Sequence, residues 1–160
     1  MVVLNGPSSA GKTTLAMALR EARSPRAAVV SVDQFFACVA PQHPDNWRLF
    51  AALTEATFAA AASFAKSGFD VVVDTVFERA DCLVMATSAL AGLRYHLVGV
   101  TCALEVLEAR ERLRGDRRPG QARDQHVRVL ENAPHELTLD TGVLSVADSV
   151  VRVVALLANE

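Results

Sequence analysis

The sequence predicts an α/β fold of three layers, in which a five-stranded parallel sheet is covered by helices on both faces. Short β-branched runs alternate with longer helix-like stretches along the chain, and the runs "VVV" at 71–73 and "VGV" at 98–100 are continuously apolar. Continuous apolar runs are typical of strands buried on both faces. Alternation of strands and helices is typical of a parallel sheet. We expect the first strand to lie in the middle of this sheet.

The individual elements follow from local patterns. Predicted strands cover residues 2–5, 27–32, 69–74, 95–101 and 137–140. Predicted helices lie near residues 12–22, 47–66, 79–91, 104–113, 124–132 and 145–157. The second helix is rich in alanine, and it ends at Lys66 before Gly68, which is a suitable C-terminal cap. In such a sheet, ligands bind beyond the carboxyl ends of the strands.

Composition narrows the class of protein. The 160 residues predict a single domain over 1–160, and 51% hydrophobic with 21% charged residues is typical of a soluble globular protein. A formal net charge of -2 gives no general attraction to nucleic acid or membranes, so we expect neither as a partner. Three separated cysteines without a Cys-x-x-Cys pair argue against a zinc site, and Asp148 and Arg152 interrupt the most apolar late segment. We therefore expect a cytoplasmic protein.

The segment "GPSSAGKT" at 6–13 fits the pattern G-x-x-x-x-G-K-[ST]. It lies between a short apolar strand and an amphipathic helix, as a phosphate-binding loop requires. Glycines allow several amide groups to point inward, and the helix N-terminus adds a positive field. The alternative is a simple Gly/Ser turn, but a full match in this context is rare by accident. The predicted nucleotide contacts are Gly6, Ser8, Ser9, Ala10, Gly11, Lys12, Thr13 and Thr14.

Within this loop, Lys12 is predicted to bridge the β- and γ-phosphates, and the Thr13 hydroxyl to bind Mg²⁺. Asp33 and Asp74 each follow an apolar strand, so both are expected at the phosphate-facing edge. Asp74 is a candidate magnesium ligand, and Asp33 a candidate general base for a substrate hydroxyl. The alternatives are a helix N-cap for Asp33 and a capped turn for Asp74. The two roles are also exchangeable at this stage.

A basic segment follows the predicted helix at 104–113. Gly115 and the Pro119–Gly120 pair punctuate it, and it predicts a lid at about 114–124. Arginines on a closing lid stabilise the transferred phosphoryl group, and we select Arg114 and Arg117 for this contact. The alternative is a solvated helix end with favourable C-terminal arginines. Arg110 and Arg112 are expected to be exposed or salt-bridged.

Aromatic side chains gather near the proposed base. Taken singly, each is typical of a core residue. Together they predict the wall of a pocket for a small, partly apolar alcohol. The residues proposed for this wall are Phe35, Phe36, Trp47 and Phe77, with Phe50 close to them in sequence.

Five segments resemble, in the same order, segments of the chloramphenicol phosphotransferase family, which belongs with the P-loop kinases of nucleoside-monophosphate-kinase type. They are "VVLNGPSSAGKTTLA", "VSVDQFF", "VVVDTVF", "RLRGDRRPGQARDQ" and "HELTLDTGVLS", and they span nearly the whole chain. The resemblance implies a P-loop kinase fold with an arginine-bearing lid. It also implies ATP-dependent phosphorylation of a hydroxyl on a small molecule, with Mg²⁺.

The resemblance also implies roles for individual residues. It makes Lys12 and Thr13 the phosphate and magnesium contacts, Asp33 the general base and Asp74 a group on the magnesium side; the lid residues are Arg114 and Arg117. A chloramphenicol-like antibiotic is the first candidate acceptor, with antibiotic resistance as the corresponding role. The region after Asp33 is shorter than in the antibiotic kinase and differs in residues, so the acceptor stays open.

Two other functions are compatible with the sequence. A kinase of a nucleotide or sugar metabolite would hold its charged acceptor with more of the lid arginines, and its acceptor affinity would fall with added salt. A nucleotide-binding regulatory switch would need segments that respond to the γ-phosphate. The guanine-binding tetrapeptide Asn-Lys-x-Asp does not occur in the sequence. No oligomeric state is predicted.

Overall fold

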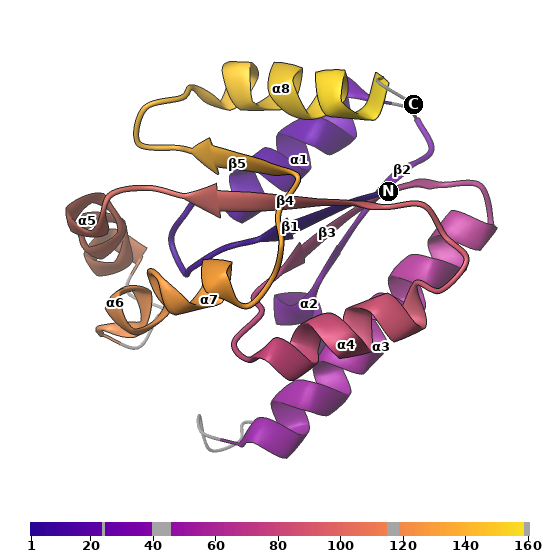
Figure 1. Cartoon of the computed structure of the whole chain (residues 1–160), viewed down its shortest axis with the longest axis horizontal. Helices are drawn as coiled ribbons and strands as arrows, with labels where there is room; N and C mark the ends of the chain where they lie inside the picture. Colours follow the sequence, from indigo (N-terminus) through magenta and orange to yellow (C-terminus); the bar gives the residue numbers. More distant parts are fainter. Residues whose placement is uncertain (24, 40–45, 115–118, 159–160) are drawn as a thin grey trace.

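The strands form one parallel sheet with the order β2-β3-β1-β4-β5 (Figure 1). The structure is a computed structural model, and it describes residues 1–23, 25–39, 46–114 and 119–158. The strands are β1 (Val2–Asn5), β2 (Ala27–Ser31), β3 (Asp70–Thr75), β4 (His96–Thr101) and β5 (Leu137–Asp140). The predicted parallel sheet of five strands, with the first in the middle, is confirmed.

Helices cover both faces of this sheet. On one face lie α1 (Lys12–Ala22) and α8 (Val146–Ala158), and on the other lie α3 (Trp47–Lys66) and α4 (Ala80–Ala89) (Figure 1). The shorter or peripheral helices are α2 (Val32–Phe36), α5 (Leu104–Arg114), α6 (Gln121–Gln125) and α7 (Arg128–Glu131). Figure 1 shows α5 and α6 beyond the arrowhead of β4, with α7 next to α6.

Each interface between the sheet and its helices has its own apolar core. Leu4 of β1 and Leu19 of α1 belong to the core under α1 and α8, whereas Val3 of β1 and Phe58 of α3 belong to the core under α3 and α4. All four side chains are buried. Successive residues of a strand point to opposite faces, so β1 supplies both cores. Burial on both faces explains the continuous apolar runs at 2–4 in β1 and 71–73 in β3.

Two short helices differ from the prediction. The structure has α6 and α7 where a single helix at 124–132 was predicted, and α6 begins three residues earlier. The buried carboxylate of Glu111 explains the early start, because it accepts hydrogen bonds from the main-chain N–H groups of Gly120 (2.9 Å) and Ala122 (2.7 Å). These groups belong to the N-terminus of α6, where a helix leaves its amides without internal partners. A distant carboxylate, invisible in local sequence, thus sets this boundary.

The helix α2 was not predicted. The Ser31 hydroxyl caps it by accepting a hydrogen bond from the N–H of Asp33 (3.3 Å). The side-chain oxygen of Gln34 accepts a second hydrogen bond from the N–H of Ser31 (2.9 Å). This is a capping box, for which the pattern Ser-x-x-Gln is the sequence signal. Ser31 therefore takes the N-cap position, which had been considered for Asp33.

Within the described residues, no helix combines the length and the apolar character that a membrane crossing requires.

Candidate active site

The phosphate loop, residues 6–13, joins β1 to α1 at the centre of the carboxyl edge of the sheet. Gly6 is packed so closely that an added Cβ atom would overlap the carbonyl oxygen of Val100 on β4. Gly11 has a φ of 91° at the N-cap of α1, a conformation that L side chains rarely adopt. Ser9 also has a positive φ, of 65°. The two glycines of the motif, Gly6 and Gly11, are thus required for different steric reasons.

Lys12 is folded back over this loop. Its side-chain nitrogen donates to the carbonyl oxygens of Gly6 (2.9 Å) and Pro7 (3.0 Å), and only 7% of the residue is exposed. The hydroxyls of Ser8 and Ser9 are buried and lack a hydrogen-bond partner in the described part of the chain. A buried ammonium group beside unsatisfied hydroxyl donors fits an anionic group such as a phosphate.

Thr13 and Asp74 meet beside the loop. The Thr13 hydroxyl donates to the Asp74 carboxylate at 2.6 Å, although 61 positions separate them in the sequence. Asp74 is buried near the end of β3, directly opposite Leu4 of β1 in the sheet register. Hydroxyl and carboxylate oxygens are ligands that Mg²⁺ prefers, and Mg²⁺ commonly takes one or two protein oxygens together with substrate phosphates. The pair therefore fits a magnesium ion.

A cleft of about 830 Å³ surrounds these groups. The sheet order divides its lining into two ends, one on each side of the phosphate loop. The end beyond β2 and β3, called the acceptor end below, is lined by Ser31, Val32, Asp33, Phe36, Phe50, Asp74, Thr75, Val76 and Glu78. The opposite end is lined by Arg110, Arg114, Gln121, Thr141, Leu144, Val146 and Ser149.

Asp33 is brought to the acceptor end by the turn from β2 into α2. It lies in the first turn of α2, its residue is exposed, and it borders the same cleft as Asp74. The two carboxylates therefore lie where the sequence placed them, at the carboxyl edge of the sheet. Asp74 is held by Thr13, whereas the helix-capping function near Asp33 belongs to Ser31.

The structure separates the four aromatic residues proposed for the pocket wall. Phe36 lines the cleft, together with Phe50. Phe77 instead lies fully buried in the core against Phe58, because its main-chain N–H is drawn inward to the side-chain oxygen of Asn5 (2.8 Å). Trp47 stacks on Phe50 with ring centroids 5.5 Å apart, outside the cleft lining.

Phe35 likewise packs against the core under α3 and α4, so it is a supporting residue and not part of the cleft lining. In the lid, Arg114 ends α5 and borders the cleft. Arg117 lies outside the described residues. Arg112 is exposed, as expected.

Arg110 differs from the expectation that it would be exposed or salt-bridged. It is half-buried and lines the cleft, and its guanidinium donates to the hydroxyl (2.9 Å) and carbonyl (3.0 Å) oxygens of Thr141. The Thr141 hydroxyl in turn donates to the carbonyl of Ala10 in the phosphate loop (2.8 Å). This chain connects α5, the end of β5 and the loop. Its members are far apart in sequence, so no local pattern predicts it.

Asn5 is a second residue that the sequence analysis missed. Its side chain is fully buried just before the phosphate loop. The oxygen accepts from the N–H of Phe77, and the nitrogen donates to the carbonyl of Val129 (2.9 Å) and to Nε2 of His135 (3.0 Å). Because the amide nitrogen can only donate, Nε2 of His135 is the acceptor, and the ring is neutral.

This contact predicts a pH-dependent stability. Burial lowers the pKa of His135 below its usual value, so the unfolded chain gains a proton at a higher pH than the folded chain does. The free energy of unfolding should therefore be highest above about pH 6.5 and fall as the pH decreases below it. Urea denaturation at pH 7.5 and pH 5.5 measures the change. His135→Gln keeps an acceptor oxygen and should lose less stability over this interval; an equal loss would contradict the assignment.

Comparison with known proteins agrees with this geometry. A sequence model of the chloramphenicol phosphotransferase-like proteins matches residues 1–158. The chain belongs to this family. A protein of Mycobacterium tuberculosis with the provisional name O-phosphotransferase Rv2636 is 28% identical over 167 residues, covering 88% of this chain and 74% of that protein. The chloramphenicol phosphotransferase-like chain is thus a phosphotransferase of the small-molecule kinase type.

Solved structures show the same P-loop kinase fold. The chloramphenicol phosphotransferase-like chain superimposes on the APS kinase CysC of Mycobacterium tuberculosis, in complex with AMPPNP and APS, with a TM-score of 0.74 and 20% identity over 98% of this chain and 96% of that one. It superimposes on the shikimate kinase of Acinetobacter baumannii, in complex with shikimate, with a TM-score of 0.69 and 16% identity over 99% and 92% of the chains. The predicted three-layer fold is confirmed.

Proposed function

We propose that this protein transfers the γ-phosphoryl group of ATP to a hydroxyl of an uncharged, partly apolar small molecule, with Mg²⁺ as cofactor. One observation carries the proposal. The Thr13–Asp74 pair and the folded-back Lys12 border the same cleft as the exposed carboxylate of Asp33. Groups suited to a magnesium nucleotide thus share a cavity with a carboxylate suited to accept a proton.

The residues divide the reaction between them. Amides of the phosphate loop and Lys12 would hold the phosphates, and Thr13 and Asp74 would supply oxygens to Mg²⁺, which when bound would neutralise charge on the phosphates. Asp33 accepts the proton of the acceptor hydroxyl while that oxygen attacks the γ-phosphorus. The bond from the γ-phosphorus to the β–γ bridging oxygen breaks, and ADP leaves. Arg114 stabilises the charge that spreads over the transferred group.

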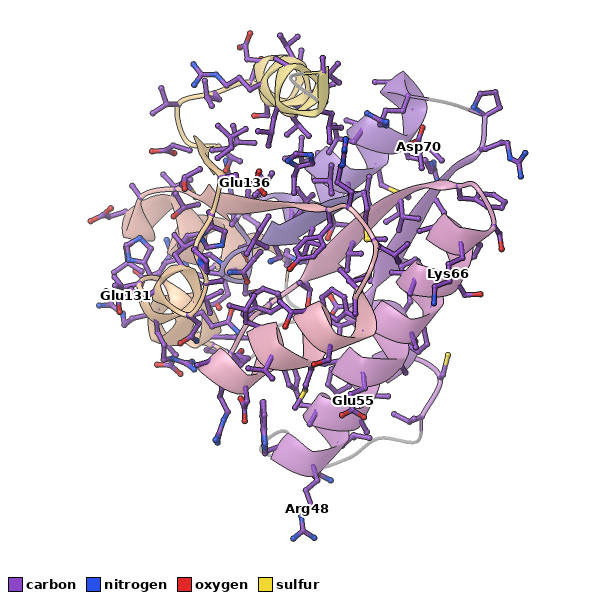
Figure 2. The ribbon with its side chains drawn as sticks, turned by 45° about the vertical axis from the view of Figure 1, so that its right-hand side comes forward. Arg48, Glu55, Lys66, Asp70, Glu131 and Glu136 are labelled. Atoms are coloured by element: carbon purple, nitrogen blue, oxygen red, sulfur yellow. The ribbon has the colours of Figure 1, made fainter. Side chains whose placement is uncertain are left out.

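Charge at the acceptor end favours an uncharged acceptor. Of the residues that line it within the described ranges, Asp33, Asp74 and Glu78 are acidic and none is basic, while Phe36 and Phe50 add apolar surface. Arg128, which is outside the lining, pairs with Glu78 (2.9 Å), so Asp33 and Asp74 carry most of this negative charge. Arg48 on the neighbouring α3 extends away from the body of the molecule (Figure 2). An acceptor with a carboxylate or phosphate would be repelled there. A chloramphenicol-like alcohol has the required character, and it is the first candidate.

A panel of alcohols tests the function. Purified protein is incubated with Mg·ATP and one alcohol at a time (chloramphenicol, a neutral sugar, a nucleoside and shikimate), and mass spectrometry measures the gain of one phosphoryl group. We expect transfer to an uncharged alcohol, and the Michaelis constant of that alcohol should change by less than about twofold between 0.05 and 0.5 M NaCl because no ion pair is screened.

Transfer only to an anionic acceptor, with a Michaelis constant that rises with salt, would instead support a kinase of a charged metabolite. Hydrolysis of ATP that no alcohol accelerates would contradict the proposed function altogether. Heat-inactivated protein provides the control for uncatalysed transfer.

A further inference from the structure

Gln125 on α6 links the phosphate loop to the acceptor end. Its side chain is almost entirely buried, with 2% of the residue exposed. The amide oxygen accepts a hydrogen bond from the main-chain N–H of Ser8 at 2.6 Å. The amide nitrogen donates to a carboxylate oxygen of Glu78, which follows β3. Both Gln125 and Glu78 border the cleft.

The chemistry of the two partners fixes the orientation of this amide. The N–H of Ser8 can only donate and an ionised Glu78 carboxylate can only accept, so rotating the amide by 180° would leave two unfavourable contacts. At position 125, neither leucine nor glutamate can both accept from the N–H of Ser8 and donate to the Glu78 carboxylate. Burying an amide also costs free energy unless it is paired, so a residue that only fills space here would be apolar.

The link is anchored at both ends. Arg128 of α7 donates to the other carboxylate oxygen of Glu78 (2.9 Å) and to its main-chain oxygen. On the opposite side, Glu111 of α5 holds the start of α6. Ser8 precedes Ser9, the loop residue with the positive φ. A displacement of Gln125 would therefore affect both the loop conformation and the position of the Glu78 carboxylate.

We propose that Gln125 is a positioning residue that couples the phosphate loop to the wall of the acceptor end through Ser8 and Glu78. Nucleotide affinity then depends on the oxygen of its amide, and acceptor placement depends on the nitrogen. The second part of this inference rests on the proposed function.

Two variants separate the two contacts. Gln125→Glu retains an oxygen for the N–H of Ser8 but opposes the Glu78 carboxylate, whereas Gln125→Leu loses both bonds. By calorimetry, Gln125→Leu should weaken the binding of Mg·AMP-PNP about tenfold, and Gln125→Glu by less than about threefold. With an alcohol that the wild type phosphorylates, Gln125→Glu should raise its Michaelis constant about tenfold and change kcat by less than about twofold.

Rescue provides the decisive comparison. The double variant Gln125→Glu/Glu78→Gln exchanges the amide and the carboxylate, so it should restore the Michaelis constant to within about threefold of the wild type. Hydrogen exchange of peptides covering residues 75–79 gives a readout without an acceptor: exchange should increase in Gln125→Glu and decrease again in the double variant. Glu131→Gln, an exposed change on the neighbouring helix α7 and outside the cleft lining, is the matched control and should leave each quantity unchanged.

The outcomes decide separately on the two proposals. Thermal unfolding first establishes that each variant is folded. Equal nucleotide affinity in Gln125→Leu and wild type, or no recovery of exchange in the double variant, would overturn the role of Gln125. If the wild type phosphorylates no alcohol, the proposed function fails alone, because nucleotide binding and hydrogen exchange still test the coupling.

Discussion

Replacing Asp33 by asparagine is expected to lower the turnover of ATP-dependent phosphorylation by about 10²–10⁴-fold. The asparagine side chain has nearly the same shape, but it cannot accept the proton of the acceptor hydroxyl. Asp33 is exposed at the acceptor end, whereas Lys12, Thr13 and Asp74 are the side chains proposed to hold the magnesium nucleotide, so the affinity for Mg·ATP should stay within about twofold of the wild type. Steady-state kinetics measures the first quantity and calorimetry the second.

Asp81→Asn is the matched control for this variant. Asp81 lies in the first turn of α4, pairs with Arg79 on the surface at 3.3 Å and is not part of the cleft lining. The same chemical change there should leave turnover within about twofold. Turnover in Asp33→Asn that equals the wild type, in a folded protein, would remove Asp33 from the mechanism.

Sequence reasoning recovered the parts of this protein that depend on local chemistry. The strands β1 and β5 and the helices α1 and α3 have the predicted bounds. Continuous apolar runs, helix periodicity and the motif at 6–13 each carry their signal within a short window. The location of Asp33 and Asp74 in one cleft also follows from local patterns, because a parallel sheet brings the carboxyl ends of its strands to a single edge. Their chemical roles stay predictions.

The parts that sequence reasoning missed depend on contacts between distant residues. Glu111 caps the start of α6, Asn5 joins the loop to Phe77, and Gln125 joins it to Glu78. Each is a single polar side chain, which is paired because it is buried, and nothing in its neighbouring residues specifies its partner. Phe77 illustrates the converse: its proximity to Asp74 in sequence favoured a pocket wall, but its main-chain bond to Asn5 turns it into the core.

Replacing Lys12 by methionine is expected to have the second large effect, and the expected result differs from that of Asp33→Asn. Methionine has a similar length but no charge. Lys12 is buried and reaches over the loop to Gly6 and Pro7. The other lysine of the sequence, Lys66, lies at the end of α3 and cannot replace it. Loss of this donor should lower turnover by about 10²–10³-fold, and it should also weaken the binding of Mg·ATP, which calorimetry measures.

Lys66→Met is the matched control, because Lys12 and Lys66 are the lysines of this sequence and Lys66 lies exposed at the end of α3 (Figure 2). It removes the same charge far from the cleft lining, so kinetics and nucleotide binding should be unaffected. The two active-site variants then separate the two halves of the cleft: Lys12→Met affects nucleotide and turnover together, and Asp33→Asn affects turnover alone. Unchanged nucleotide affinity in a folded Lys12→Met protein would show that the loop holds phosphates by its amides without this side chain.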